Sequence, residues 1–149
     1  MHINTKRSLV GVIIILGLIG MLTSIYLTAI HYKETAVNQP CDINPQVSCS
    51  TVNSSAYSEF YGIPVAGFGV LFFLITLFMC WLILKKDKHY HRLMYWHILG
   101  LLFVIYFIVI EVILRTVCPL CSLVHVIVII TLILSILIYR AETQTNIAN

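Results

Sequence analysis

Charged side chains are scarce in this sequence. Only 10% of its 149 residues are Asp, Glu, Lys or Arg, whereas a soluble globular domain carries about 25%. The nine Lys and Arg residues form no basic tract with interleaved aromatic side chains, so nucleic acid is not an expected partner. Hydrophobic residues make up 60% of the chain. This balance is typical of an integral membrane protein in contact with lipid.

Repeats, low-complexity tracts and flexible linkers are also missing, so we expect one membrane domain over residues 1–149. Four long apolar runs lack a central charge, and each has about the 20 residues that a membrane-spanning helix needs. They cover residues 9–30, 64–84, 93–114 and 119–139. The first run is longer than the apolar core of a signal peptide. The sequence therefore predicts an all-α bundle of four transmembrane helices.

The basic residues are placed at alternate ends of these runs. Lys6 and Arg7 precede the first run, and the connection 85–92 is rich in Lys and Arg, whereas the long connection 31–63 is net negative. Lys and Arg mark the cytoplasmic side of membrane proteins. We therefore expect a protein of the cell (inner) membrane with both termini in the cytoplasm and the loop 31–63 outside.

The long outer loop has its own pattern. Residues Cys49 to Tyr61 are rich in Ser, Tyr and Phe, which favours a short helix in the membrane interface. Gly62-Ile63-Pro64 then predicts a turn into the second span, with Pro64 as its first helical residue.

The motif Cys118-Pro119-Leu120-Cys121 comes directly before the last apolar run. Proline fits the first helical position because its missing N–H has no partner there anyway. Cys118 would then be the N-cap residue and Cys121 would lie in the first turn. The positive end of the helix dipole favours a thiolate, the form that attacks disulfides. This motif predicts thiol–disulfide exchange.

The predicted topology sorts the five cysteines. Cys41, Cys49, Cys118 and Cys121 meet on the outer, oxidising side, whereas Cys80 lies near the inner end of the second span. Two other interpretations remain: a non-enzymatic membrane protein with structural disulfides, and a metal-binding cysteine cluster. A zinc site would need a closed tetrahedral shell, and the spacing of Cys41 and Cys49 departs from the usual knuckle, so no metal is expected. Cys80 is expected to pack as a small hydrophobe.

The ordered set of motifs resembles the vitamin K epoxide reductase family. The resemblance rests on Cys41 and Cys49, Ser55 six residues beyond Cys49, the pair Phe68-Gly69, and the Cys118–Cys121 motif. It extends from about residue 9 to residue 139. Disulfide bond formation protein B also generates disulfides with a quinone, but it places its CxxC motif in the first outer loop.

The resemblance implies a relay of electrons. Cys41 would form the mixed disulfide with a partner, Cys49 would pass electrons to Cys118, and Cys121 would face a quinone. The acceptor would be menaquinone or ubiquinone, with a vitamin K-type naphthoquinone possible in principle. The partner would be a separate extracytoplasmic thioredoxin-fold (DsbA-like) protein, since the chain is too short to contain the thioredoxin domain that some bacterial relatives carry.

Three further positions are assigned to the quinone site by this resemblance: Ser55, Phe68 and His125. Animal members carry Tyr where this chain has His125, one helical turn beyond Cys121. An ionisable side chain inside a span is a functional candidate, although a histidine hydrogen-bonded to a neighbouring helix is the alternative. Animal members also carry Asn where counting back from Phe68 gives Val65, which weakens any expectation of epoxide reduction.

Four further residues in the third span and at its end are expected to have structural roles. Glu111 and Arg115 are four residues apart near the end of the third span, a spacing that predicts an ion pair on one helix face. Trp96 and Tyr106 are expected to serve packing or the interfacial belt rather than the quinone site.

Overall fold

The computed structural model describes residues 3–33, 39–86 and 90–147. Within these ranges, four long helices are each long and apolar enough to cross a membrane, so the predicted four-helix membrane bundle is confirmed. The elements are α1 (Ile3–His31), α2 (Cys49–Asn53), β1 (Glu59–Phe60), β2 (Ile63–Pro64), α3 (Val65–Lys86), α4 (Tyr90–Leu114) and α5 (Pro119–Ile147). Helices α1 and α5 extend several residues beyond the apolar runs, because helical hydrogen bonds continue where hydropathy ends.

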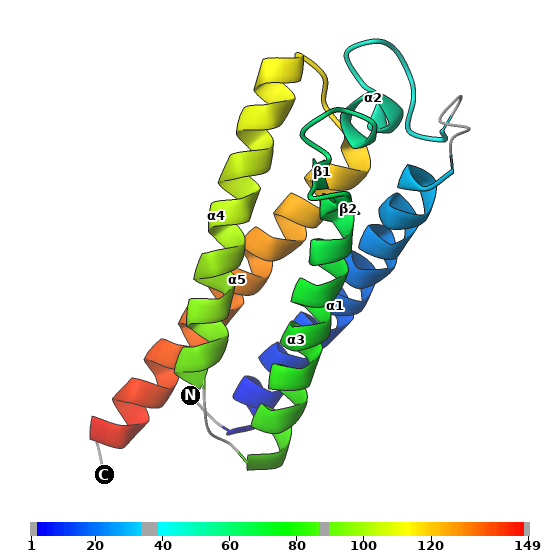
Figure 1. Cartoon of the computed structure of the whole chain (residues 1–149). Helices are drawn as coiled ribbons and strands as arrows, with labels where there is room; N and C mark the ends of the chain where they lie inside the picture. The colour runs from blue at the N-terminus through cyan, green and yellow to red at the C-terminus, as the bar shows by residue number, and fades with distance from the viewer. Residues whose placement is uncertain (1–2, 34–38, 87–89, 148–149) are drawn as a thin grey trace.

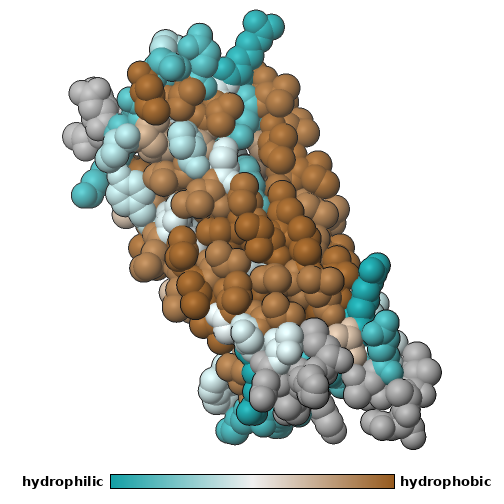
Figure 2. Space-filling model, turned by 180° about the vertical axis from the view of Figure 1, so that it is seen from behind, coloured by the Kyte–Doolittle hydropathy of each residue, from teal (hydrophilic) through white to brown (hydrophobic). Residues whose placement is uncertain are grey.

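The four long helices form an open arrangement (Figure 1). Helix α1 packs against α3 and α5, and α4 packs against α5, whereas α3 and α4 make few contacts with each other. The start of α1 and the end of α5 lie at one end of the bundle, and α2 and the β1–β2 hairpin lie at the other. Figure 2 shows a hydrophobic band between two hydrophilic ends, as expected for a protein surrounded by lipid. Lys88, which contributes to the topology prediction, lies outside the described residues.

Close approach of α1 and α3 depends on two glycines. A methyl group on Gly20 would lie 2.3 Å from the ring of Phe73, and one on Gly69 would lie 2.8 Å from the hydroxyl of Ser24. Phe73 is 1% exposed and Ser24 is 2% exposed. These glycines therefore let the two helices pack at a distance that alanine would not allow.

The end of the bundle that holds the termini has its own core. Val10, Ile13, Ile83, Leu93 and Ile138 are buried there, together with the free thiol of Cys80, which is fully buried as a small hydrophobic residue. Lys6 of α1 forms an ion pair with Glu142 of α5. This ion pair joins the first and last helices at the edge of the hydrophobic band.

The outer loop contains the expected short helix, α2, and a hairpin that was not expected. Tyr61 and Gly62 connect β1 to β2 with positive φ angles of 53° and 77°, the signature of the tight turn that matches strand twist. Because Pro64 pairs with Glu59 in this hairpin, α3 begins one residue later, at Val65. The prediction that Pro64 opens the second span was wrong by one residue.

Candidate functional site: two cysteine pairs beside an apolar cavity

The Cys118–Cys121 pair begins α5 as the sequence predicted. Pro119 is the first helical residue, and the backbone N–H of Cys121 donates to Cys118 Sγ at 3.1 Å. The carbonyl of Cys118 accepts the first intrahelical bond, from the N–H of Ser122 at 2.9 Å. The two cysteines form a disulfide with a Cα–Cα distance of 5.2 Å. Cys118 is therefore the N-cap residue of a helix whose first turn contains its redox partner.

The Cys41–Cys49 disulfide joins the outer loop to the start of α2, with a Cα–Cα distance of 5.7 Å. Asp42 organises this junction: its carboxylate accepts hydrogen bonds from the hydroxyl of Ser48 and from the backbone N–H groups of Ser50 and Gln39, at 2.8–3.0 Å. Partial burial alone would raise the pKa of the Asp42 carboxyl, but these hydrogen bonds outweigh it and lower the pKa to about 2. Asp42 therefore holds the loop together as a carboxylate.

Backbone pairing brings the two disulfides together. The N–H of Ser48 donates to the carbonyl of Val117 at 3.0 Å, and the N–H of Val117 donates to the carbonyl of Gln46 at 2.8 Å. Cys49 and Cys118 each follow one of these paired residues, both are 0% exposed, and both belong to one buried cluster with Cys41. The loop pair and the helix pair thus form one redox centre.

The end of α4 contradicts one expectation. Arg115 adopts a left-handed conformation, φ 52°, and the N–H of Thr116 donates to the carbonyl of Glu111 at 3.1 Å, the pattern of a Schellman helix end. Arg115 therefore lies past the helix and no longer above Glu111. Both residues are among those described, and no ion pair joins them. The predicted Glu111–Arg115 pair is wrong.

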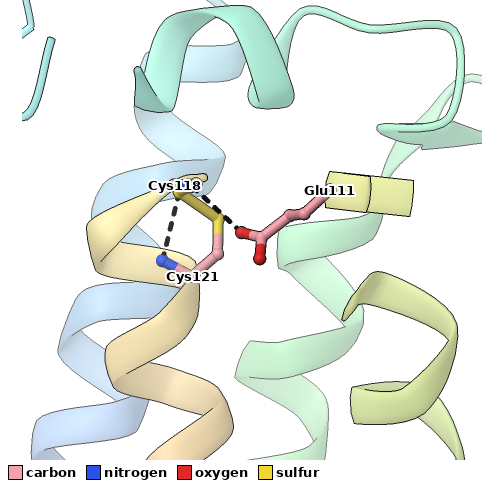
Figure 3. Close-up of side chains that lie close together, drawn as sticks. All are labelled: Glu111, Cys118 and Cys121. Carbon is pink, nitrogen blue, oxygen red and sulfur yellow. Dashed lines mark hydrogen bonds between the residues drawn. A yellow bond between two sulfur atoms is a disulfide. The ribbon is translucent and has the colours of Figure 1, made fainter. Parts of the chain in front are cut away.

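Glu111 instead faces the Cys118–Cys121 disulfide (Figure 3). Its Oε1 accepts a hydrogen bond from the backbone N–H of Cys118 at 3.0 Å, and a carboxylate oxygen and the two sulfurs all lie within 4.8 Å of one another. Sequence reasoning missed this contact because helical periodicity assigned Glu111 a neighbour on its own helix. The signal available was a glutamate seven residues before a CxxC cysteine, across a four-residue connection.

The same three side chains form a cluster of possible metal donors. One carboxylate and two thiolates provide three donors, whereas a structural zinc site uses four. Both sulfurs are bonded to each other in the disulfide, so neither is a free thiolate. The donor set does not match a closed zinc site.

An apolar cavity of about 320 Å³ adjoins the redox centre. Helices α3 and α4 contribute most of its walls, with α1, α5 and the segment 52–58 completing them. Of the four cysteines in the two disulfides, Cys121 lines the cavity, and Cys41, Cys49 and Cys118 do not. Within the helix pair, Cys121 is therefore the member that borders the cavity, and both members contact the cluster of the loop pair.

All three residues assigned to the quinone site by resemblance line this cavity: Ser55, Phe68 and His125. The His125 ring stacks on Phe107 at a centroid distance of 6.1 Å and is 7% exposed. Among the described residues, neither ring nitrogen has a hydrogen-bond partner in another helix, unlike the structural histidine considered above. The hydroxyl of Ser55 donates to the carbonyl of Val52 at 2.8 Å.

Two aromatic residues in the cavity wall were not foreseen. Trp96 stacks on Phe72 at 5.2 Å, and both rings line the cavity, although Trp96 was expected to serve packing or the interfacial belt. The indole N–H donates to Thr76 Oγ1 at 3.1 Å, which fixes the ring. Val65, which stands where animal members carry Asn, also lines the cavity, so that wall position is apolar in this chain.

Comparison with known proteins gives a family match. A model described as the vitamin K epoxide reductase family matches residues 11–136 of the 149-residue chain. The match includes both cysteine pairs and the residues of the cavity wall. No curated protein matches the chain as a relative.

Proposed function

Because this chain belongs to the vitamin K epoxide reductase family, we propose that it passes electrons from a soluble dithiol protein to a quinone in the membrane. The family and the two cysteine pairs at disulfide distance make it a thiol oxidoreductase. The proposal adds the direction of electron flow, the quinone and the partner. Its product would be a disulfide in the partner, and hence support for disulfide bond formation.

The contact between the two cysteine pairs supports the relay most strongly. Cys41, Cys49 and Cys118 are buried in one cluster, Cys121 packs against it, and Cys121 also lines the cavity. The four cysteines therefore form one continuous group that reaches from the loop to the cavity. Successive thiol–disulfide exchanges need such a group, because each thiolate must reach the next sulfur.

The cavity suits a quinone headgroup. Its volume of about 320 Å³ is at the lower end of the range of ligand sites, roughly 300–1,000 Å³. Aromatic rings of Phe68, Phe72, Trp96 and Phe107 form much of the lining, which matches a flat apolar ring. A protonated His125 ring nitrogen would donate to one of its carbonyl oxygens, whereas the Ser55 hydroxyl hydrogen is already donated to the carbonyl of Val52. A bound quinone would supply a two-electron, two-proton acceptor.

Access from the lipid is also consistent with a quinone. Several residues line the cavity and are at the same time half-exposed on the outside of α3 and α4: Phe68 at 39%, Leu71 at 52%, Leu99 at 43% and Phe103 at 52%. They lie where these two helices make few contacts with each other. A molecule with a long apolar tail would enter sideways between α3 and α4 and leave its tail in the bilayer.

The residues of this chain would carry the electrons in two exchanges. A thiolate of the partner attacks Cys41 Sγ, the Cys41–Cys49 bond breaks, and Cys49 leaves as a thiolate; the partner's second thiol then displaces Cys41 and the partner departs as a disulfide. Cys49 attacks Cys118 Sγ, the Cys118–Cys121 bond breaks, and Cys121 leaves as a thiolate beside the cavity. The Cys41 thiolate then attacks Cys49 Sγ, which re-forms the Cys41–Cys49 disulfide and releases Cys118, so that Cys118 and Cys121 hold the two electrons. The position of Cys121, with His125 one turn further along α5, is suited to reduction of the acceptor by this pair.

The partner is proposed to be a separate thioredoxin-fold protein outside the cytoplasm. The positive-inside rule, applied to Lys6, Arg7 and the loop 85–92, supports an inner-membrane protein with cytoplasmic termini and an outer redox centre. The two termini and this centre do lie at opposite ends of the bundle. Ile43, which is 74% exposed, and Val117, which is 48% exposed, offer apolar contact area beside the Cys41–Cys49 loop.

Reconstitution would test the proposal directly. Purified protein in lipid vesicles containing menaquinone or ubiquinone is mixed with a reduced thioredoxin-fold dithiol protein, and quinol formation is followed by absorbance. We expect quinol and oxidised donor in equal amounts. Cys121→Ala should stop quinol formation while the Cys41–Cys49 disulfide still accepts electrons from the donor.

Cys80→Ala is the matched control, because Cys80 is buried at the opposite end of the bundle and should leave the activity unchanged. Wild-type vesicles that reduce neither quinone with any dithiol donor would contradict the proposal. The two disulfides would then be structural.

A further inference from the structure

Glu111 is a buried carboxyl group that the relay as described above does not use. It is 9% exposed, it lies within the α4 span, and no cation is paired with it among the described residues. Burying a carboxyl group in a membrane span without a cation is costly, so such a group is a functional candidate. Arg115, the cation nearest in sequence, is turned outward by its left-handed conformation.

The position of the carboxyl group points to the Cys118–Cys121 disulfide. Oε1 is occupied by the N–H of Cys118 at 3.0 Å, which fixes the side chain. The second oxygen has no hydrogen-bond partner among the described residues, and Figure 3 shows it farther from the sulfurs than the bonded oxygen. A group held by one oxygen and free at the other is suited to exchanging a proton.

We propose that Glu111 is the general acid for opening the Cys118–Cys121 disulfide. When the thiolate of Cys49 attacks Cys118 Sγ, the Cys49–Cys118 bond forms, the Cys118–Cys121 bond breaks, and the electron pair of that bond stays on Cys121 Sγ. The carboxyl group of Glu111 gives its proton to this sulfur. The step begins with a Cys49 thiolate and a neutral carboxyl group, and it ends with a Cys121 thiol and a Glu111 carboxylate.

A carboxylate oxygen of Glu111 lies within 4.8 Å of both sulfurs. Breaking the disulfide frees Cys121 Sγ to rotate about its Cα–Cβ bond, and catalytic hydrogen bonds commonly tighten only during the reaction. The helix dipole alone would favour a thiolate on Cys121, which would readily attack Cys118 and re-form the old bond. Protonating Cys121 prevents this return, so the acid gives the exchange its forward direction.

At this end of the bundle, His31 and Glu59 form an ion pair with each other and Arg115 is exposed. The groups of the two cysteine pairs and their neighbours remain to be compared with Glu111. On α5 they are Cys118, Cys121 and His125, and on the outer loop and α2 they are Cys41, Asp42 and Cys49. Asp42 is held as a carboxylate by three hydrogen bonds, and His125 lines the cavity. Glu111 is the carboxyl group of this set that has an oxygen within 4.8 Å of both sulfurs.

The inference rests on the proposed relay, and its test needs no quinone. Protein in detergent receives a small excess of dithiothreitol to reduce Cys41–Cys49, and samples are quenched with acid at millisecond intervals. Free thiols are alkylated, and mass spectrometry measures the rate at which the Cys49–Cys118 disulfide appears between pH 5 and pH 9. A general acid typically contributes about 10²–10⁴-fold to such a step.

Glu111→Gln keeps an oxygen that accepts the N–H of Cys118 but cannot give a proton. We expect it to slow formation of Cys49–Cys118 by about 10²-fold and to flatten the pH profile. The matched control is Arg115→Gln, an exposed position at the same helix end, which should retain the wild-type rate and profile. Formation of Cys49–Cys118 at the wild-type rate in Glu111→Gln would overturn the inference. If Glu111→Ala formed this disulfide slowly while Glu111→Gln formed it at the wild-type rate, Glu111 would only position Cys118.

A solvent isotope measurement covers the case in which Glu111→Gln does not fold. Exchange in the wild-type protein should be slower in D₂O than in H₂O if a proton moves in the step, and equal rates would overturn the inference. Failure of the proposed function looks different. In that case the wild-type protein forms no Cys49–Cys118 disulfide under any condition.

Discussion

The backbone N–H of Ser48 donates a hydrogen bond to the carbonyl oxygen of Val117 at 3.0 Å. Each of these residues directly precedes a cysteine, so one bond positions Cys49 of the loop pair beside Cys118 of the helix pair. The side chain of Thr116 adds a second tie, donating to the carbonyl of Pro45 at 3.1 Å. The two redox pairs are therefore held together by groups that do not change with their oxidation state.

The first prediction concerns this contact between the pairs. Replacing Cys41 and Cys121 together by Ala leaves Cys49 and Cys118 without their present partners, and mild oxidation should join them as a disulfide because they share one buried cluster. Mass spectrometry of proteolytic fragments measures the linkage. The variant Cys41→Ala with Cys118→Ala is the control. It leaves Cys49 and Cys121, and we expect a lower yield from it because Cys121 faces the cavity.

Histidine 125 is the subject of the second prediction. A hydrogen bond from its ring to a quinone oxygen would strengthen as negative charge develops there, and losing such a donor costs about 10²–10³-fold in rate. We expect His125→Ala to slow quinone reduction by at least about tenfold and to leave the exchange between Cys41–Cys49 and the partner nearly unchanged. His125→Tyr should recover part of the loss.

Stopped-flow measurement of the two half-reactions separates these effects. Tyr106→Phe is the control, because Tyr106 is 48% exposed and its neighbour Phe107, not Tyr106, lines the cavity. If the His125→Ala protein reduces quinone at the wild-type rate, His125 has no part in the reaction and only packs on Phe107.

The third prediction is a pH dependence at Asp42. Its pKa of about 2 lies below the value of about 3.9 for a free aspartate, so the folded state favours the carboxylate. The stabilisation is fully present above about pH 4 and is lost as the pH falls toward about 2. Asp42→Asn should lower the free energy of unfolding by about 1 kcal/mol at pH 6, as loss of a helix cap does.

Thermal unfolding of both proteins in detergent between pH 2 and pH 6 measures this difference. The two curves should converge at the acid end, where the wild-type carboxylate is also protonated. A constant difference over the whole range would mean that the charge of Asp42 contributes nothing.

The fourth prediction tests the packing of α1 on α3. An added methyl group at Gly20 would lie 2.3 Å from the Phe73 ring, whereas nothing lies within 4 Å of the same group at Gly11. Gly20→Ala should therefore lower the free energy of unfolding by about 1–3 kcal/mol. Gly11→Ala, in the same helix, should have no effect or stabilise slightly. Adding Phe73→Leu to Gly20→Ala should restore part of the loss, and equal melting temperatures for the two alanine variants would show that α1 and α3 separate freely.

Local patterns in the sequence were enough for the helices and for the beginning of α5. A long apolar run crosses a lipid bilayer as a helix because the helix satisfies its own backbone hydrogen bonds. Pro119 beside Cys118 specifies a helix start, because proline has no N–H to leave unpaired there. The start of α3 differed from the prediction by one residue. Pro64 pairs with Glu59 across a two-residue turn, so the helix begins at Val65 and not at Pro64. Such pairing depends on positive φ angles at Tyr61 and Gly62, which hydropathy does not report.

Contacts between distant parts of the chain were not predictable in the same way. The bond from Glu111 to Cys118 depends on how α4 ends, and the left-handed conformation of Arg115 cannot be read from helical spacing. The stack of Trp96 on Phe72 joins two spans, and nothing in either segment alone specifies the other. The family resemblance led to Ser55, Phe68 and His125, which the cavity brings together, but it did not lead to Glu111.

The tie between the loop and the start of α5 also constrains how the protein is made. Thr116 and Pro45 are bonded across 71 positions of sequence, so a ribosome delivers the loop well before the segment on which it docks. A nascent chain with two spans inserted would present Cys41 and Cys49 as a lone pair, open to oxidation by any thiol oxidant on that side of the membrane. Docking must then wait for the α4–α5 hairpin to enter the bilayer, which makes insertion of that hairpin the event that completes the enzyme.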